Sequence, residues 1–165
     1  LHAHEVNQAR EARGEWTING VWFWGGGHQV AVPGRHFSTV TGDDPLAVAL
    51  ATNADVRTIP LTRSAPAWLR SAPFNTGSHH LVVLGALTSP ARRGDLAAWR
   101  DALAALDADW IAPLLVALRG GKIAELALVA PGTEACQRFE LHRADLLRFW
   151  RMRRSLADFV PRSVP

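Results

Sequence analysis

Two apolar runs on either side of a long amphipathic stretch constrain the fold of this chain most strongly. The first run, His79–Leu87, has an apolar centre without alternation, which is typical of a central strand covered on both faces. The second run, Ile123–Ala130, indicates another buried strand. Between them, Asp95–Leu118 carries leucine and tryptophan at helical spacing, which predicts a long helix with a kink before Pro113. This order predicts a right-handed βαβ unit, and hence an α/β fold, a three-layer sandwich with a largely parallel sheet.

Shorter elements complete the expected fold. Glu5–Arg13 is expected to form a short helix that Gly14 ends. Asp44 at the N-cap and Pro45 at the first helical position predict a helix over residues 45–52. The other expected elements are strands over Phe37–Thr41, Val56–Leu61 and Gln137–Leu141, one helical turn around Trp68 within an irregular segment 62–78, a basic loop over Thr88–Gly94, and a basic helix over Ala144–Leu156.

The composition is typical of one globular domain. Because 48% of the 165 residues are hydrophobic, we expect a single α/β domain over residues 1–165. No apolar run approaches the roughly 18 residues of a membrane span, so we expect no membrane association. The chain opens without methionine on a polar segment, and we expect it to be the C-terminal part of a longer protein. The lone Cys136 fits a cytoplasmic location and is expected to be buried and inert, with a reactive thiol as the alternative.

The basic charge of the chain is almost entirely arginine. The formal net charge is +3 and Lys122 is the only lysine, so the isoelectric point near 10.3 does not by itself indicate nucleic-acid binding. The expected C-terminal helix does place Arg148, Arg151 and Arg154 three residues apart. An arginine-rich interaction module is therefore an alternative function, with a solvated helix face as the simpler interpretation.

A glycine triplet follows the most unusual apolar segment of the sequence. Val21–Trp24 has the composition of a buried strand, and it ends at Gly25, Gly26 and Gly27. Backbone N–H groups in such a turn can hold an anion, because no Cβ atom stands in the way. A tight turn beneath two indole rings explains the same residues, and both interpretations stay open. In a parallel sheet, the loops after Trp24, Leu87 and Ala130 are expected to share one rim.

Two arginines near the N-terminus are also candidates for anion binding. Arg10 and Arg13 are three residues apart, so the expected helix presents them on one face. Each guanidinium can donate two parallel hydrogen bonds to a carboxylate or a phosphate. A solvated surface helix accounts for the same spacing.

The N-terminal motifs resemble a known family. Asn7, Arg10 and Arg13-Gly14, then Ile18-Asn19 leading into Val21–Gly27, are similar to a segment of the archaeal-type, bisphosphoglycerate-independent phosphoglycerate mutases, which belong to the alkaline phosphatase superfamily. The segment from Trp22 to Gly27 is the most specific match, and the rest of the chain follows the family by order and spacing. The resemblance implies an alkaline-phosphatase-like fold, of which this chain would be the C-terminal portion.

The chain departs from the family at the metal ligands. The resemblance places Thr88 and Arg92 where the family has an Asp and a His, and Pro131-Gly132 where it has an Asp-His pair. Only His142 stands where the family has a ligand histidine. Such a set cannot hold two cations, so we expect no metal, no cofactor and no catalytic residue. The family's serine nucleophile would lie in an N-terminal part outside this chain.

These observations predict a degenerate phosphoglycerate-mutase-like domain that is not catalytic and that binds a phosphorylated or acidic ligand or has a regulatory role. Arg92 and Arg93 can supply positive charge where the family has metal, with solvated loop arginines as the alternative. A second hypothesis is an active metal-dependent phosphoglycerate mutase or phosphatase, with ligands recruited from His79, His80, His142, Asp95, Asp43 and Asp44. The candidate ligand-binding residues are Asn7, Arg10, Arg13, Asn19, Gly25, Gly26, Gly27, Arg92 and Arg93.

Overall fold

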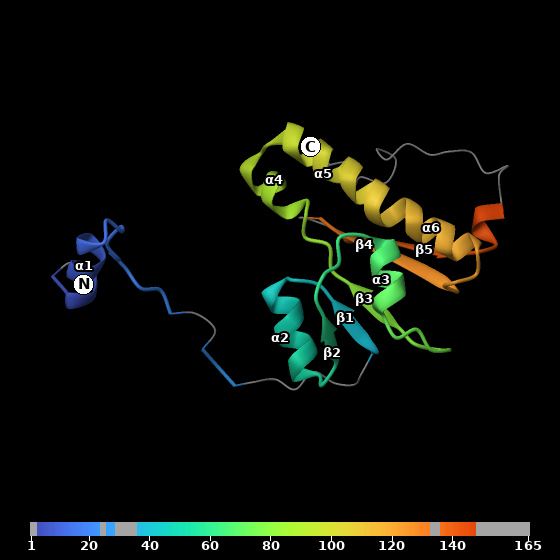
Figure 1. Cartoon of the computed structure of the whole chain (residues 1–165), viewed down its shortest axis with the longest axis horizontal. Coiled ribbons are helices and arrows are strands. Elements are labelled where there is room, and N and C mark those ends of the chain that lie inside the picture. Colours follow the sequence, from blue (N-terminus) through green and yellow to red (C-terminus); the bar gives the residue numbers. More distant parts are fainter. Residues whose placement is uncertain (1–2, 24–25, 29–35, 133–135, 148–165) are drawn as a thin grey trace, which may run out of the picture. The chain divides into compact units, whose positions relative to one another are not determined.

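The computed structural model describes residues 3–23, 26–28, 36–132 and 136–147 (Figure 1). The chain divides into two compact units, Leu1–Val32 and Pro33–Pro165. Whether the two form one domain, as the sequence predicts, stays a prediction. No helix in the described residues is long and apolar enough to cross a membrane.

The described part of the N-terminal unit contains one helix. α1 spans Glu5–Ala12, and Gly14 follows it with a φ of 71°, as the sequence predicts. The prediction of a buried strand after it is wrong over residues 21–23. These residues form no strand, and Trp22 and Phe23 are 88% and 90% exposed. A strand needs a hydrogen-bonding neighbour, and the described part of this unit holds no other strand.

The second unit contains a small parallel sheet, as the sequence predicts. Its strands are β1 (Thr39–Thr41), β2 (Arg57–Ile59) and β3 (His80–Val82), in the order β2-β1-β3. The central strand is therefore the fully buried β1, whereas β3 is half-buried at an edge. The prediction that His79–Leu87 forms the central, fully covered strand is wrong. The first part of this apolar run forms β3, and residues 83–87 form the loop that follows.

Two helices accompany this sheet. α2 spans Pro45–Asn53 and α3 spans Ala65–Ser71, longer than the single turn predicted around Trp68. Asp44 caps α2 by accepting hydrogen bonds from two of its backbone N–H groups, each at 2.9 Å, as predicted. Figure 1 shows β1 and β2 between α2 and α3, so the unit has an α/β arrangement.

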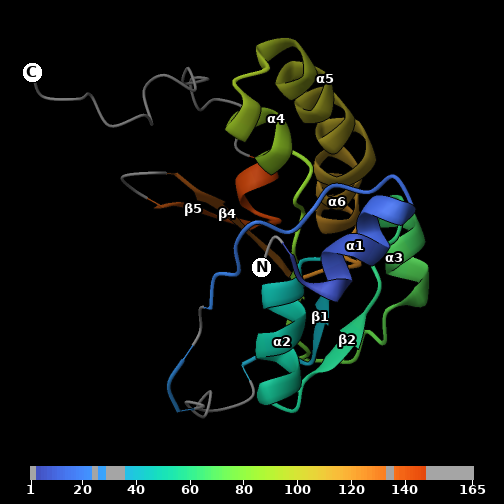
Figure 2. The same ribbon diagram turned by 90° about the vertical axis from the view of Figure 1, so that its left-hand side faces the viewer.

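The long helix predicted after residue 95 is confirmed, with an insertion near its middle. It consists of α5 (Leu96–Leu106), a π-helical turn η1 (Asp107–Ile111) and α6 (Ala112–Arg119), which Figure 1 and Figure 2 show as one continuous rod. Pro113 lacks an N–H group and its ring would crowd the carbonyl four residues earlier, so the wider π turn relieves this conflict. Before the rod, the predicted basic loop is instead a helix, α4 (Thr88–Arg93).

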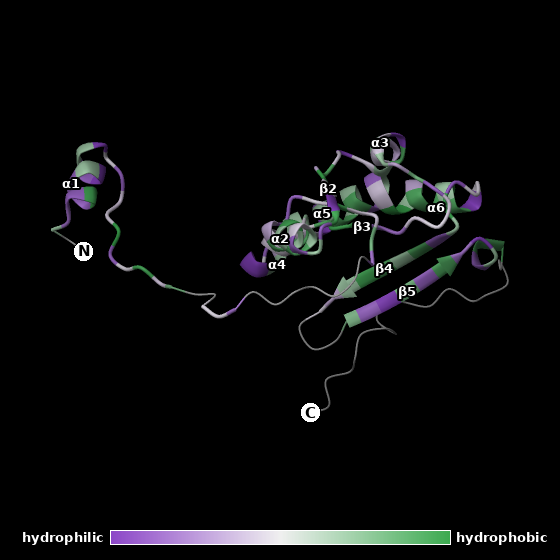
Figure 3. Cartoon of the chain, turned by 90° about the horizontal axis from the view of Figure 1, so that it is seen from below, coloured by the Kyte–Doolittle hydropathy of each residue, from purple (hydrophilic) through white to green (hydrophobic). Residues whose placement is uncertain are grey.

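The last two strands form a separate ribbon. β4 (Glu125–Pro131) pairs antiparallel with β5 (Cys136–His142), as Figure 3 shows. Most residues of β4 are exposed. The prediction that β4 is a buried strand of the parallel sheet is therefore wrong, while the predicted edge strand β5 is confirmed. Cys136 is exposed, so the prediction of a buried thiol is also wrong. Beyond the short helix η2 (Asp145–Leu147), the predicted basic helix lies outside the described residues.

The core of the second unit is built around two tryptophans. Trp68 on α3 and Trp110 in the π turn are each 5% exposed, and their ring centroids are 6.4 Å apart. Phe74 meets Trp68 edge-on at 5.0 Å. The cluster also includes Ala65 and Leu114, with Leu61, Leu69, Ala72, Val82, Leu84, Ile123 and Leu126 packed against it.

Candidate functional site

Asn7, one of the predicted ligand-binding residues, is buried in the N-terminal unit. The residue is 2% exposed. Its side-chain amide forms hydrogen bonds with both backbone groups of Ile18. Oδ1 accepts from the Ile18 N–H at 2.7 Å, and Nδ2 donates to the Ile18 carbonyl at 3.0 Å. Asn7 therefore holds the segment after α1 against the helix, as a neighbouring strand would.

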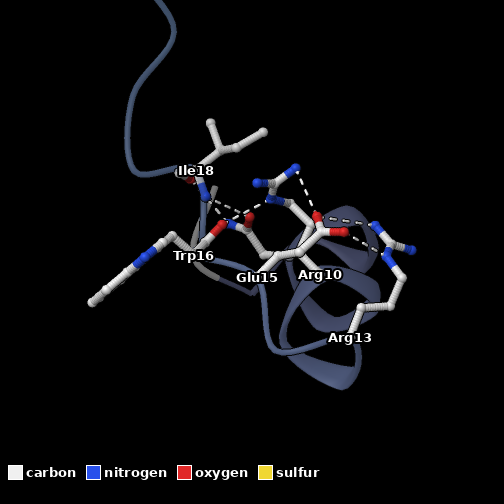
Figure 4. Close-up of polar contacts among 6 residues, drawn as sticks. Arg10, Arg13, Glu15, Trp16 and Ile18 are labelled. Atoms are coloured by element: carbon white, nitrogen blue, oxygen red, sulfur yellow. Dashed lines mark hydrogen bonds and ion pairs between the residues drawn. The ribbon is translucent and has the colours of Figure 1, made fainter.

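Arg10 and Arg13 converge on one carboxylate (Figure 4). Arg10 Nη1 lies 3.1 Å from Glu15 Oε2, and Arg13 Nε lies 3.0 Å from Glu15 Oε1. The Arg13 hydrogen bond lowers the pKa of Glu15 most, and the charge of Arg10 lowers that pKa further. Arg10 Nε also donates to the Trp16 carbonyl at 2.8 Å. The predicted shared face exists, and a carboxylate from the chain itself occupies it.

The glycine segment contributes no enclosed site among the described residues. Gly26 and Gly27 are exposed, no other atom lies within 4 Å of the position a Cβ would take on either, and Gly27 has a φ of 139°. Gly25 lies outside the described residues. Asn19 is exposed and accepts a hydrogen bond from Thr17 Oγ1 at 3.2 Å. An anion cradle at these glycines stays a prediction.

The two arginines predicted near the metal region lie on α4. Both are exposed, and Arg93 Nη1 donates to Ser89 Oγ at 2.6 Å. Arg92 makes no ion pair with any described residue. The rim predicted for the loops after Leu87 and Ala130 does not form, because β3 and β4 belong to different sheets.

The described residues do not fit a two-metal centre. They contain no group of three His, Cys, Asp or Glu side chains placed to hold a cation. Asp44 and Asp95 instead serve as helix N-caps, with Asp95 accepting from an α5 backbone N–H at 3.0 Å. Pro131 pairs with Cys136, whereas His142 pairs with Glu125 at the other end of the ribbon. The residues that the second hypothesis would recruit as ligands form no such group: His79, His80, His142, Asp43, Asp44 and Asp95.

The sequence suggested His80 only as a recruited metal ligand, and the structure places it in a hydrogen-bonded cluster of the second unit. His80 Nδ1 lies 2.7 Å from Thr39 Oγ1, and His80 Nε2 lies 2.8 Å from Ser78 Oγ. Ser78 Oγ also donates to the Asn75 carbonyl at 2.7 Å. Ser78 gives its one proton to the Asn75 carbonyl, so Nε2 of His80 must carry a proton and donate it to Ser78 Oγ. Nδ1 accepts from the Thr39 hydroxyl in the neutral ring and donates to it in the charged ring.

Burial beside two aromatic rings favours the neutral state of His80. The His80 ring lies 4.7 Å from the ring centroid of Phe74 and 6.0 Å from that of Trp68. Burial lowers the pKa of His80 most, and the charge of the adjacent His79 lowers that pKa further. A neutral imidazole with both nitrogens occupied holds the edge strand β3 to β1, which is a structural task.

We expect His80 to make stability depend on pH. Below its unfolded pKa of 6.5, the unfolded chain binds a proton that folded His80 resists, so the free energy of unfolding should fall as the pH falls toward the lower folded pKa. Urea unfolding from about pH 7.5 to about pH 5 would measure this, compared with His80→Gln, which cannot titrate. The gap between the two proteins should narrow as the pH falls. A constant gap would contradict the assignment.

A broad depression lies on the described surface of the second unit. It has a volume of about 500 Å³, is wide open to solvent, and is lined by residues at the end of α2 and the start of β2. Asp55, in its wall, has a φ of 53°. The depression lies at the amino end of β2, whereas ligands of parallel sheets gather at the carboxyl ends. The lining residues are Thr52, Asp55, Val56, Arg57 and Thr58.

Comparisons with protein-family models, with curated proteins and with solved structures found no match for this chain. The functional argument therefore depends on the geometry of its own residues. Within that geometry, two guanidinium groups, those of Arg10 and Arg13, converge on the carboxylate of Glu15.

Proposed function

We propose that this chain is a metal-free, non-catalytic domain of the phosphoglycerate mutase type, within the alkaline phosphatase superfamily, that binds a phosphorylated or acidic small molecule. The proposal combines the resemblance of the N-terminal motifs with the chemistry of the arginines. A regulatory role follows if ligand binding changes how the domain associates with other proteins.

The contact of Arg10 and Arg13 with Glu15 carries the proposal. Two guanidinium groups within 3.1 Å of the two oxygens of one carboxylate form a site of the size and charge that a phosphate or a second carboxylate needs. Glu15 and Arg13 are exposed and the Arg10 side chain is 31% exposed, so solvent weakens the internal ion pairs and a stronger anion can compete with them. Glu15 then acts as a built-in occupant that an acidic ligand displaces.

The positions of the family's metal ligands support a non-catalytic role. Pro131 and His142 lie at opposite ends of a seven-residue ribbon. Six steps of about 3.3 Å separate such ends by roughly 20 Å. Two-metal sites for phosphoryl transfer hold their cations about 4 Å apart. Ligands supplied from both positions would not meet at such a centre.

The proposal predicts that Glu15→Gln binds 3-phosphoglycerate a few-fold more tightly than the original chain. The amide keeps the size of the side chain and removes the charge that occupies the arginines. Isothermal titration calorimetry at low ionic strength would measure the dissociation constants, because added salt screens such contacts. Arg10→Gln and Arg13→Gln should each weaken binding.

The matched control is Glu11→Gln, which removes an exposed acid of α1 whose carboxylate has no partner among the described residues. It should leave the affinity close to that of the original chain. Glycerol, which lacks charge, should not bind. Equal affinities of Glu15→Gln and Glu11→Gln would overturn the proposed site, and manganese-dependent conversion of 3-phosphoglycerate would overturn the non-catalytic assignment.

A further inference from the structure

The second strand of the ribbon, β5, has an edge that no described strand covers. β5 pairs with β4 alone among the described strands, and Figure 3 shows it on the far side of β4 from α3 and α6. The N–H group of His142 donates to Asp145 Oδ2 at 3.1 Å, so it points toward this edge. In an antiparallel strand, alternate residues direct both backbone groups to the same side. The even-numbered residues of β5 therefore present their backbone groups at this edge.

We propose that β5 pairs antiparallel with β5 of a second copy of this chain, about a twofold axis at Phe139. Pairing would join the two ribbons into a four-stranded antiparallel sheet. A sheet of three or more strands with an apolar face is more stable than a two-stranded ribbon. The seven residues of β5 are long enough for such pairing.

The charges of β5 select this register. Directly opposite residues of two antiparallel strands point to the same face of the sheet. A twofold axis perpendicular to the sheet must therefore lie midway between two facing copies of the same residue. An axis at Arg138 would place arginine against arginine, and an axis at Glu140 would place glutamate against glutamate. An axis at Phe139 places Arg138 opposite Glu140 of the second copy, and it does so twice. Opposite charges in directly facing positions stabilise a sheet, and like charges destabilise it.

The backbone and the apolar face agree with the same axis. Arg138 and Glu140 are the positions with outward backbone groups, so they form the hydrogen-bonded pairs across the new interface. The two Phe139 residues then form the non-hydrogen-bonded pair, in which Cα atoms approach to about 4.5 Å. Phe139 shares its face with Leu128, its neighbour on β4, which is 37% exposed. The dimer would continue this apolar face across the axis.

The edge charges do not protect β5 against pairing with itself. Charges of a single sign prevent edge-to-edge association, because two copies repel each other. In β5 the signs alternate, and Arg138 Nη2 lies 2.8 Å from Glu140 Oε1 of the same strand with both side chains more than half exposed. In the dimer, Arg138 of each copy can pair with Glu140 of the other copy. These two ion pairs replace the ion pair within each strand, so dimer formation leaves no charge without a partner.

Sedimentation equilibrium of the whole chain tests the proposal. We expect a monomer–dimer equilibrium whose dissociation constant rises about tenfold or more in Arg138→Glu, since two facing pairs become repulsive. Exchanging both charges, Arg138→Glu with Glu140→Arg, should restore the dimer. Arg70→Glu, an exposed arginine on α3, should leave it unchanged. A chain that stays monomeric at several hundred micromolar, or a double exchange without rescue, would overturn the proposal.

Cysteine cross-linking tests the register independently. In a Cys136→Ser background, Phe139→Cys should form an intermolecular disulfide on mild oxidation, because the facing Cα atoms lie within the roughly 7 Å that a disulfide spans. Gln137→Cys shares that face of β5 but would lie roughly 14 Å from its copy, so it should not cross-link. Equal cross-linking of both variants, or none at Phe139→Cys, would overturn the twofold axis.

Discussion

Replacing Trp68 with alanine is expected to lower the free energy of unfolding of the second unit by about 3–5 kcal/mol. Trp68 is 5% exposed and packs against Phe74 and Trp110, so its removal leaves a large cavity at the centre of the core. Its indole Nε1 also donates to Thr41 Oγ1 at 3.0 Å, and this bond joins α3 to the central strand. One side chain thus connects the sheet, α3 and the π turn.

Urea unfolding followed by circular dichroism would measure the loss in Trp68→Ala. Trp16→Ala is the matched control, because Trp16 is 92% exposed and should change stability by less than about 0.5 kcal/mol. Trp68→Phe separates packing from hydrogen bonding, since it keeps an aromatic ring and leaves the Thr41 hydroxyl without its donor. We expect a loss of about 1–2 kcal/mol for that variant. Equal stability of Trp68→Ala and Trp16→Ala would contradict the observed core.

Replacing Gly42 with alanine is expected to destabilise the parallel sheet by about 1–3 kcal/mol. A Cβ atom at this position would lie 3.1 Å from Val83 Cβ and 3.3 Å from the Val83 carbonyl oxygen. Neither side can move freely, because Gly42 N–H bonds to the Ile59 carbonyl and Val83 N–H bonds to the Thr41 carbonyl. The clash therefore falls at the carboxyl ends of β1 and β3.

Gly85→Ala is the control for this substitution. No other atom lies within 4 Å of a Cβ built at Gly85, and its alanine variant should be neutral or slightly stabilising because it restricts the unfolded chain. Thermal unfolding of the two variants side by side would compare them. Equal melting temperatures would contradict the close approach of Gly42 and Val83.

Local signals in the sequence predicted most of the helices. Asp44 and Pro45 mark the start of α2, and the capping oxygen of Asp44 makes the bonds expected of it. The leucine and tryptophan spacing predicted the long rod, and Pro113 predicted its irregularity. Each signal depends on residues within about one turn of the element, so no distant contact was needed to interpret it.

Strand partners were predicted less well, because they depend on distant contacts. The apolar residues of β4 would suit a parallel sheet or a hairpin equally, and the short connection to β5 decided for the hairpin. The strand predicted before the glycine triplet was wrong for a related reason. Trp22 and Phe23 have strand composition, but the described part of their unit offers no strand to pair with them.

In the candidate site, too, the local feature was predicted from the sequence and the contacts were not. The spacing of Arg10 and Arg13 predicted that they share a helix face, and they do. The sequence did not indicate that Glu15 occupies them. That contact requires the chain to reverse at Gly14, and Asn7 secures the reversed segment by bonding Ile18. The sequence suggested His80 as a recruited metal ligand, and its hydrogen bond to Thr39 was not predicted because the two residues are 41 positions apart in sequence.

The amino-acid sequence by itself determined where α1, α2 and the α5–α6 rod form, since helical hydrogen bonds and caps join residues close together in the chain. Only the tertiary structure decided which strands pair, that β1 and not β3 is central, and which groups Arg10, Arg13 and His80 contact. Strand pairing and side-chain contacts join residues far apart in sequence, and burial in the assembled core selects among combinations that are locally equivalent.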